Sequence, residues 1–478
     1  MYPPITYFIV EDIMRNPKIG VLPLYIALYD RDSPQMRPAI DAAHANTVTR
    51  LKEQGLDVIT WTVCRLQEEF AEAIKYFEDE KVDAIVTLHL AYSPSLESAK
   101  ALASTDLPII ILDTTPTYSF NQYTDASAID LNHGIHGVQD MCNLLLRNNK
   151  KFVICAGHMD HSNVLQKVVN AAKSAQVVNT MKHARVGIVG EPFDGMGDFS
   201  IAFDELKADL GVEIVPYDWQ KDAERANAVT QEQIDAEYEN DLLRFEFDPS
   251  VTREIYDRSA KASLIIRNWL EEEHLTGFSV NFLEIEAFRA GLNVMPFTEC
   301  CTAMTRGIGY AGEGDVLTAA LTGSLLSAFE ETTFTEMFCP DWEGGALFLS
   351  HMGEYNYVIA DGKPVLYEKN FPHTSAQNPT AAYKTMKEGR AVLINLAPFG
   401  DGRYTLTLAP GQMLKIAGEN KMDRVTNGWF KPDIPLETFL EEYSKNGATH
   451  HSALVYGDVL EQLLPLADFL GCKCVVIK

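Results

Sequence analysis

The chain has 478 residues, of which 46% are hydrophobic, and this length predicts roughly three globular domains. Its 67 acidic and 40 basic side chains give a net charge of -27, which argues against nucleic acid and anionic membranes as partners. No apolar run reaches the roughly 20 residues that cross a bilayer. The N-terminal segment MYPPITYFIVEDIMRNPK lacks the pattern of a secretory signal, so we expect a cytoplasmic protein.

The first third of the chain alternates β-rich runs with amphipathic, helix-like segments. The expected strands are 18–30, 56–64, 82–90 and 107–115, and the expected helices between them are 36–55, 68–81 and 95–106. A second alternating set begins at residue 151, after the polar turn at 147–151. Alternation of this kind is typical of parallel sheets with helices on both faces.

After about residue 330 the pattern changes to short extended runs separated by Gly, Pro and Asn turns, as in 345–352, 356–368 and 390–419. The sequence therefore predicts an α/β protein of three domains. Two doubly wound parallel-sheet domains, at 1–149 and 150–328, precede a mainly antiparallel, β-barrel-like domain at 329–478.

The most distinctive motif is the glycine-rich run GIGYAGEGD. Its segment 307–312 formally matches the GxGxxG pattern of dinucleotide sites. Glu313 and Asp315 would place negative charge where a pyrophosphate needs backbone N–H groups, which argues against a nucleotide. The glycines on both sides of Glu313 favour a carboxylate presented on a tight turn.

Further candidates follow in the last third of the chain. Glu336 lies between Phe334 and Phe338 in an extended run. Taken singly, an acid such as Glu336 is more often a loop residue, and a histidine such as His351 is more often a residue of the core. Together with Glu313 they form a set of two carboxylates and two imidazoles, which suits Mn²⁺, Co²⁺ or Mg²⁺ better than Zn²⁺. The two imidazoles are those of His351 and of one residue of the adjacent pair His450 and His451, which cannot both face the ion in an extended segment.

Several motifs in one order carry a family resemblance. The runs GYAGEGD…TAAL, TFTEMF, SHM and GATHHS, with LNHGIHG, CAGHMD and FDGMGD upstream, resemble the L-arabinose isomerases of the L-arabinose/L-fucose isomerase superfamily. The resemblance covers nearly the whole chain. It implies a three-domain subunit that assembles into trimers and hexamers and binds a divalent ion, usually Mn²⁺.

The resemblance also implies roles for individual residues. Glu313, Glu336, His351 and His451 correspond to the metal ligands, and Glu313 and Glu336 also carry the proton between C1 and C2 of the open-chain sugar. His450 is expected to assist ring opening or to orient His451. The expected sugar-binding residues are His133, His136, Met196, Phe282 and Tyr92, with the first two reaching across a subunit interface.

The chain also departs from the family pattern, and the departures fall on substrate-facing segments. The family's Gln-His-Leu-Tyr-Gly segment is replaced by VLPLYIALYDRD, a usual Trp by Val316 and a usual Gln by His133. The predicted reaction is therefore aldose–ketose isomerisation with the sugar left open among arabinose, fucose, galactose or a relative. Two alternatives remain: a metal-dependent hydrolase, and a non-catalytic sugar-binding protein.

Overall fold

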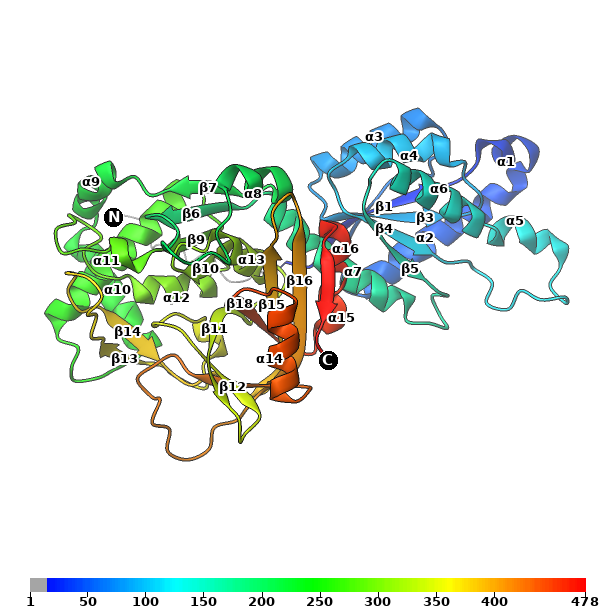
Figure 1. Ribbon diagram of the computed structural model, residues 1–478. Helices are drawn as coiled ribbons and strands as arrows, with labels where there is room; N and C mark the ends of the chain where they lie inside the picture. Colours follow the sequence, from blue (N-terminus) through cyan, green and yellow to red (C-terminus); the bar gives the residue numbers. More distant parts are fainter. Residues whose placement is uncertain (1–14) are drawn as a thin grey trace. The chain divides into compact units, whose positions relative to one another are not determined.

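The computed structural model describes residues 15–478, which form two compact units (Figure 1). The N-terminal unit comprises Arg15–Asn179 with Glu461–Gly471, and the C-terminal unit comprises Thr180–Leu460 with Cys472–Lys478. Residues 1–14, on which the cytoplasmic prediction depends, lie outside the described residues. Within 15–478, no helix combines the length and apolarity needed to cross a membrane.

A five-stranded parallel sheet with the order β2-β1-β3-β4-β5 forms the centre of the N-terminal unit. Its strands are β1 (Lys18–Leu24), β2 (Asp57–Thr60), β3 (Ala84–His89), β4 (Ile109–Asp113) and β5 (Phe152–Ala156). Strands β1, β3 and β4 are buried almost throughout because helices cover both faces of the sheet. The strand expected at the start of a second domain is β5, which pairs with β4 in this first sheet.

Helices alternate with these strands along the chain. They include α2 (Arg37–Glu53), α3 (Gln67–Asp79), α4 (Ser95–Ser104), α6 (Ile135–Arg147) and α7 (Val164–Lys182). Helix α3 buries Phe70 and Phe77, and a Cβ on Gly20 of β1 would lie 2.6 Å from the Phe77 ring. The glycine therefore allows α3 to lie close to β1.

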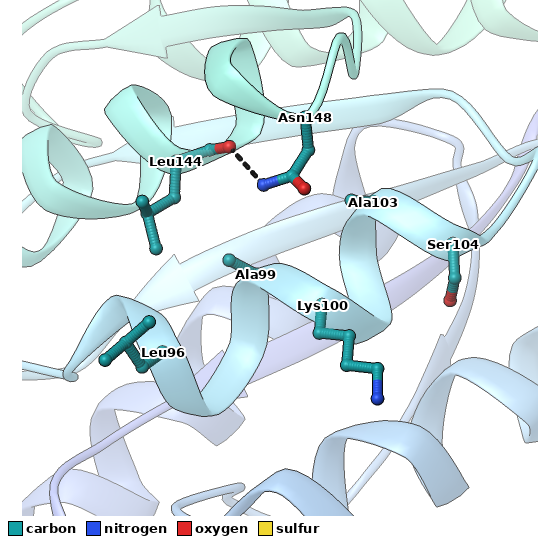
Figure 2. Close-up of a pocket in the computed structure, with 7 residues that line it drawn as sticks. All are labelled: Leu96, Ala99, Lys100, Ala103, Ser104, Leu144 and Asn148. Carbon is teal, nitrogen blue, oxygen red and sulfur yellow. Dashed lines mark hydrogen bonds between the residues drawn. The ribbon is translucent and has the colours of Figure 1, made fainter.

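A surface pocket of about 360 Å³ lies between α4 and α6 (Figure 2). Leu96, Ala99 and Leu144 supply apolar surface there. Asn148 donates a hydrogen bond to the carbonyl oxygen of Leu144 at 2.7 Å. None of the predicted site residues lines this pocket.

The C-terminal unit begins with a second parallel sheet, of order β10-β9-β6-β7. Its strands are β6 (Arg185–Val189), β7 (Glu213–Pro216), β9 (Gly277–Val280) and β10 (Gly309–Gly312). The surrounding helices include α8 (Phe203–Leu210), α10 (Gln231–Arg244), α11 (Arg253–Glu272), α12 (Phe297–Thr305) and α13 (Val316–Leu326). Helix α13 is buried along its whole length, and Gly309 lets it approach β10, since a Cβ there would lie 2.2 Å from backbone atoms of Ala319 and Gly323.

The rest of this unit is a closed antiparallel barrel of order β15-β18-β11-β12-β17-β16, completed by the pairing of β15 with β16. Its strands are β11 (Thr332–Asp341), β12 (Ala346–Ser350), β15 (Gly389–Pro398), β16 (Tyr404–Met413), β17 (Gly428–Pro432) and β18 (His451–Tyr456). Strand β19 (Lys473–Val476) adds to β16 in parallel. A small sheet joins β8 (Glu246–Phe247), β13 (Val365–Glu368) and β14 (Thr380–Tyr383).

The predicted fold class is confirmed: two parallel α/β sheets precede a closed antiparallel barrel. The division into domains at residues 149 and 328 stays a prediction. The two compact units do not test it, because they are separated by their internal contacts, at residues 179 and 460. In the C-terminal unit, β10 ends at Gly312, and α13 packs against β10, β11 and β18. The end of a parallel strand and two barrel strands therefore meet around the same helix.

Candidate active site

Glu313 follows directly after β10 in a backbone conformation that few side chains adopt. Its φ is +64°, in the left-handed region, and that of Gly314 is +83°. The turn is held by a hydrogen bond from the Glu313 N–H to the Val280 carbonyl at 3.0 Å and by one from the Gly314 N–H to Ser279 Oγ at 2.9 Å. The strained turn thus places the carboxylate beyond the edge of the parallel sheet.

Gly312 is required for a different reason. A Cβ at this position would lie 2.5 Å from Cε1 of His351 and 2.9 Å from its Nε2. Only glycine lets the imidazole come this close to the end of β10. The two glycines of the motif therefore serve separate purposes: Gly314 continues the left-handed turn, and Gly312 makes room for His351.

The barrel contributes its residues through strand register. Glu336 on β11 lies opposite His451 on β18 on one side and opposite Ser350 on β12 on the other. Side chains at directly paired positions share a face of the sheet, so Glu336 and His451 point the same way. Phe334, two residues earlier, packs between His351 and His451, with ring centroids 4.8 and 5.0 Å away.

Three potential ligand atoms come together here. One atom each from Glu313, His351 and His451 lies within 4.8 Å of the other two. Both histidines are buried. Nε2 of His451 lies 3.5 Å from Oε2 of Glu313, and among residues 15–478 it has no hydrogen-bond partner. A buried ring nitrogen without a partner, beside a carboxylate, fits a metal ligand.

A buried carboxylate holds each of these imidazoles by its other nitrogen. Nδ1 of His351 lies 2.7 Å from Oε2 of Glu354, which also accepts a hydrogen bond from the Gly353 N–H at 2.8 Å. Nδ1 of His451 lies 3.1 Å from Oδ2 of Asp315, the N-cap residue of α13. A carboxylate that binds one ring nitrogen directs the other toward a metal.

The charges of the cluster are strongly coupled. Burial alone would raise the pKa of Glu313, but the nearby imidazoles of His450, His451 and His351 hold it well below its usual range. Burial would lower the pKa of His451, yet Asp315 and Glu313 raise it to about 9. A cation that binds here would compete with protons for the same carboxylate and imidazole atoms.

His450 stands at the rim of the cluster, with its side chain 33% exposed. Its Nε2 lies 3.9 Å from Oε2 of Glu313, and Nδ1 lies 2.7 Å from Oδ2 of Asp198. Burial would lower the pKa of His450, but the hydrogen bond to Asp198 and the nearby Glu313 carboxylate raise it to about 10. Burial would raise the pKa of Asp198, and the hydrogen bonds from His450 lower it to about 2.

Glu336, the fourth predicted ligand, is partly exposed and outside the group of atoms within 4.8 Å. The register of β11 shifts between Met337 and Cys339, which marks a β-bulge just beyond Glu336. Bulges bend a strand and redirect its side chains, often next to active sites. The bulge leaves Phe338 exposed, with its ring centroid 6.5 Å from that of His351.

Two of the predicted sugar-binding residues lie near the Glu313 turn. The ring of Phe282 contacts those of Phe193 and His373, with centroids 5.7 and 5.3 Å away. The Phe193 N–H donates to the Glu313 carbonyl at 2.9 Å, which ties this aromatic group to the turn. Met196 belongs to the same segment, since its N–H donates to the Phe193 carbonyl at 3.3 Å.

The other three form a separate cluster in the N-terminal unit. His136 stacks on Tyr92 and on His133, with ring centroids 4.4 and 5.0 Å apart, and Nε2 of His133 lies 2.9 Å from the hydroxyl oxygen of Tyr29. The intervening glycine Gly134 packs against the end of β3, where a Cβ would lie 2.9 Å from the His89 carbonyl oxygen. These side chains lie beyond the carboxyl ends of the parallel strands, where doubly wound sheets usually bind ligands.

Sequence reasoning missed four side chains that support the site. Asp315 had a signal, because an Asp directly before an apolar helix is a typical N-cap. Glu354, three residues after His351, had a weaker one. Asp198 ends the quoted run FDGMGD, but nothing in that run shows what its side chain binds, and Phe199 had no signal. Both meet the histidines only through the fold, where Phe199 stacks on His451 with ring centroids 5.2 Å apart.

Fold and site together define a class of protein: an α/β protein with an antiparallel barrel, in which a turn from the parallel sheet presents a carboxylate to barrel histidines. Comparisons with known proteins specify the family. The family model of the L-arabinose isomerase central domain matches residues 204–328, and that of the L-arabinose isomerase C-terminal domain matches residues 331–473. Together they cover more than half of the chain, which belongs to the L-arabinose isomerase family and so to the aldose–ketose isomerases.

Full-length relatives agree with this assignment. The L-arabinose isomerase of Aeromonas hydrophila is 25% identical over 91% of this chain and 90% of its own length. That of Clostridium beijerinckii is 26% identical over 84% of this chain and 82% of its own. Among solved structures, a periplasmic solute-binding protein from Actinobacillus succinogenes with bound D-allose covers 65% of this chain at 14% identity, with a TM-score of 0.17.

Proposed function

We propose that the protein is a metal-dependent aldose–ketose isomerase that works through an enediol. The observation that carries the proposal is the pair of imidazoles, His351 and His451, whose Nδ1 atoms are held by buried carboxylates beside Glu313. This arrangement orients imidazoles for a cation and leaves carboxylates for proton transfer. Neither a sugar-binding protein nor a simple structural core needs both imidazoles oriented for a cation and carboxylates placed for proton transfer.

Glu313, Glu336, His351 and His451 would hold one divalent ion. Two carboxylates and two imidazoles suit Mn²⁺, and also Co²⁺ or Mg²⁺, with sugar oxygens completing the coordination. The bound ion would supply Lewis-acid stabilisation of the negative charge that develops on the sugar oxygens. Glu336 lies on the same sheet face as His451, so a side-chain rotation brings its carboxylate toward the other ligands.

The carboxylates then move the proton. One of Glu313 and Glu336 removes the proton from C2 of the open-chain aldose, and the electron pair of that bond forms the C1–C2 double bond while O1 gains a proton. O2 of the enediol then loses its proton, and C1 receives one from a carboxylic acid, which gives the ketose. In the preceding ring opening, His450, at the rim, donates a proton to the ring oxygen as its bond to C1 breaks, and the O1 hydroxyl loses its proton to a carboxylate of the site, which leaves the C1 aldehyde.

We infer an aldose of the L-arabinose kind as the substrate, because several relatives are named L-arabinose isomerase. Phe282 and Met196 would line the sugar site from the C-terminal unit. Tyr92, His133 and His136 would contact sugar hydroxyls from a second copy, so we also propose a homo-oligomer, a trimer or hexamer. Departures such as Val316 and His133 leave fucose or galactose as further substrates to test.

The test is a screen of free aldoses with the Mn²⁺-loaded enzyme in D₂O. We expect a ketose that carries deuterium at C1, because a proton held on a carboxylate exchanges with solvent. Ketose without deuterium would contradict the enediol and favour a hydride shift. No ketose from any aldose would contradict the isomerase proposal, and Glu313→Gln with wild-type activity would contradict its role.

A further inference from the structure

Asp198 contacts His450 twice, although 252 residues separate them in the chain. Its Oδ2 accepts a hydrogen bond from the His450 backbone N–H at 2.9 Å and lies 2.7 Å from Nδ1 of the same residue. The first contact anchors the backbone just before β18, and the second sets the orientation of the ring. One carboxylate oxygen thus fixes both the position and the rotation of the imidazole.

The orientation matters because of what lies at the other nitrogen. A carboxylate accepts hydrogen bonds, so Nδ1 of His450 is the donor in this pair. Nε2 then faces inward, 3.9 Å from Oε2 of Glu313. Without the Asp198 contact, rotation about the side-chain bonds would let either ring nitrogen, or neither, face the Glu313 carboxylate.

The residue after Asp198 acts on the second histidine. The ring of Phe199 is stacked on that of His451, with centroids 5.2 Å apart and an angle of 9° between the planes, and it is tilted against His450 at 5.6 Å. Phe199 is buried, whereas the Asp198 side chain is 40% exposed. The dipeptide Asp198-Phe199 therefore supports the two adjacent histidines, one by hydrogen bonds and one by ring packing.

We propose that Asp198 is the positioning residue of His450: it binds Nδ1 and the backbone N–H, and so presents Nε2 to the sugar beside Glu313. This inference rests on the proposed isomerase function for its catalytic consequence, and on the contacts alone for its geometry. Asp198 touches no proposed metal ligand, so its removal leaves the ion in place and disturbs only the group that transfers the proton during ring opening.

The geometric part is tested without any sugar. Diethylpyrocarbonate at pH 7 labels accessible, neutral imidazole nitrogens, and peptide mass spectrometry gives the rate at each histidine. His450 is expected to react several-fold faster in Asp198→Asn, because an amide oxygen binds Nδ1 more weakly than a carboxylate does and leaves the ring more accessible. Asp204→Asn, an exposed acid six residues on, serves as control and leaves the rate unchanged. An unchanged rate at His450 in Asp198→Asn would overturn the contact.

The catalytic part is tested by a double-mutant cycle with the Mn²⁺-loaded enzyme. Asp198→Asn is expected to lower kcat about 10- to 100-fold, as is common for residues that orient a catalytic group, with KM and Mn²⁺ retention nearly unchanged. In a His450→Gln background the same change should cost nothing more, because Asp198 acts only through His450.

The outcomes separate the two proposals. Equal losses of kcat in the wild-type and His450→Gln backgrounds would mean that Asp198 supports the fold rather than His450, and would overturn the positioning role. A lower midpoint of thermal unfolding in Asp198→Asn, together with such equal losses, would identify that structural effect. A wild-type enzyme that makes no ketose would contradict the proposed function instead, while the labelling rates would still decide the contact.

Discussion

Two histidines of the site depend on buried carboxylates that do not face the site themselves. Glu354 is 1% exposed and accepts hydrogen bonds from the Tyr310 hydroxyl at 2.9 Å and from the Gly353 N–H at 2.8 Å, besides its contact with His351. Burial would raise the pKa of Glu354, but His351 and these donors lower it. The carboxylate therefore stays ionised, and its charge makes the His351 imidazole a stronger ligand.

Glu354→Gln removes that charge and keeps the shape. We expect the Kd for Mn²⁺ to rise about 10- to 100-fold, the usual cost of losing a partner behind a metal-binding histidine. Calorimetric titration of the metal-free protein measures this directly. Glu343→Gln, on the exposed turn between β11 and β12, is the matched control and should leave the Kd unchanged. Equal affinity in Glu354→Gln and the wild type would contradict a ligand role for His351.

The sequence allowed some of these residues to be predicted and not others, for a physical reason. Glu313 could be singled out because its flanking glycines indicate a left-handed turn, which the structure has at φ +64°. Asp198 could not, because a carboxylate in a polar loop is normally solvated and nothing local indicates a partner in a distant strand. Local backbone demands are visible in a sequence, whereas contacts between distant segments are not.

At the scale of elements, a chain of buried charges joins α10, α11 and α12. Arg267 of α11 donates to Glu237 at 2.8 Å and to Glu299 at 2.7 Å. Glu299 is fully buried and also pairs with Arg306. Burial raises the pKa of Glu299, but the two guanidinium groups outweigh it and keep the carboxylate charged. Helix α12 leads into β10, and β10 ends at the turn that carries Glu313. The network therefore helps to fix the position of that turn.

Arg267→Met should strongly destabilise the C-terminal unit. It leaves Glu299 and Glu237 as buried charges with fewer partners, a change that typically costs about 3–5 kcal/mol. Urea unfolding followed by circular dichroism measures the loss. Arg253→Met on the same helix removes an exposed guanidinium paired with Asp257 and Asp235, and should cost less than about 1 kcal/mol. Similar losses of unfolding free energy in the two variants would mean that the buried network stabilises the unit no more than an exposed ion pair does.

Many of the helices and strands were predicted from the spacing of apolar residues, and the exceptions have a physical reason. Helix α3 and strands β3 and β4 lie where the pattern predicted them, whereas the expected strand 18–30 ends as β1 at Leu24 and is followed by a short helix at Ala27–Asp32. The small sheet was not predicted. Its strand β8 has two residues and pairs with β13, which lies more than a hundred residues later. A pair that short has no local pattern to reveal it.

At the scale of the whole molecule, alternating strands and helices predicted the parallel sheets, because each such connection is local. A mainly antiparallel, barrel-like domain was predicted, but the order of its strands was not. Strand β11 pairs with β18, so that Thr332 lies opposite Val455. The same pairing places Glu336 opposite His451, and the candidate metal site therefore depends on contacts between strands more than a hundred residues apart in the chain.

The N-terminal unit contains a buried histidine that should make its stability depend on pH. His89, at the end of β3 in the N-terminal unit, is buried, and among the described residues neither of its ring nitrogens has a hydrogen-bond partner. Burial, helped by the nearby His136, lowers the pKa of His89 to about 3, while Asp140 opposes the shift. An unfolded histidine has a pKa near 6.5, so below that pH the unfolded chain binds a proton that the folded unit refuses.

This proton sets the sign and the range of a pH effect on stability. The contribution of neutral His89 is complete above pH 6.5 and is lost as the pH falls toward 3, with roughly 2 kcal/mol lost by pH 5 at about 1.4 kcal/mol per pH unit. His89→Met should abolish that loss, since thioether burial is independent of pH. Hydrogen exchange of peptides from β1, β3 and β4 at pH 8 and 5, corrected for intrinsic rates, measures it. His161→Met, at an exposed position of the same unit, is the control and should retain the wild-type dependence. If His89→Met lost as much protection at pH 5 as the wild type, another group would control the acid sensitivity of the N-terminal unit.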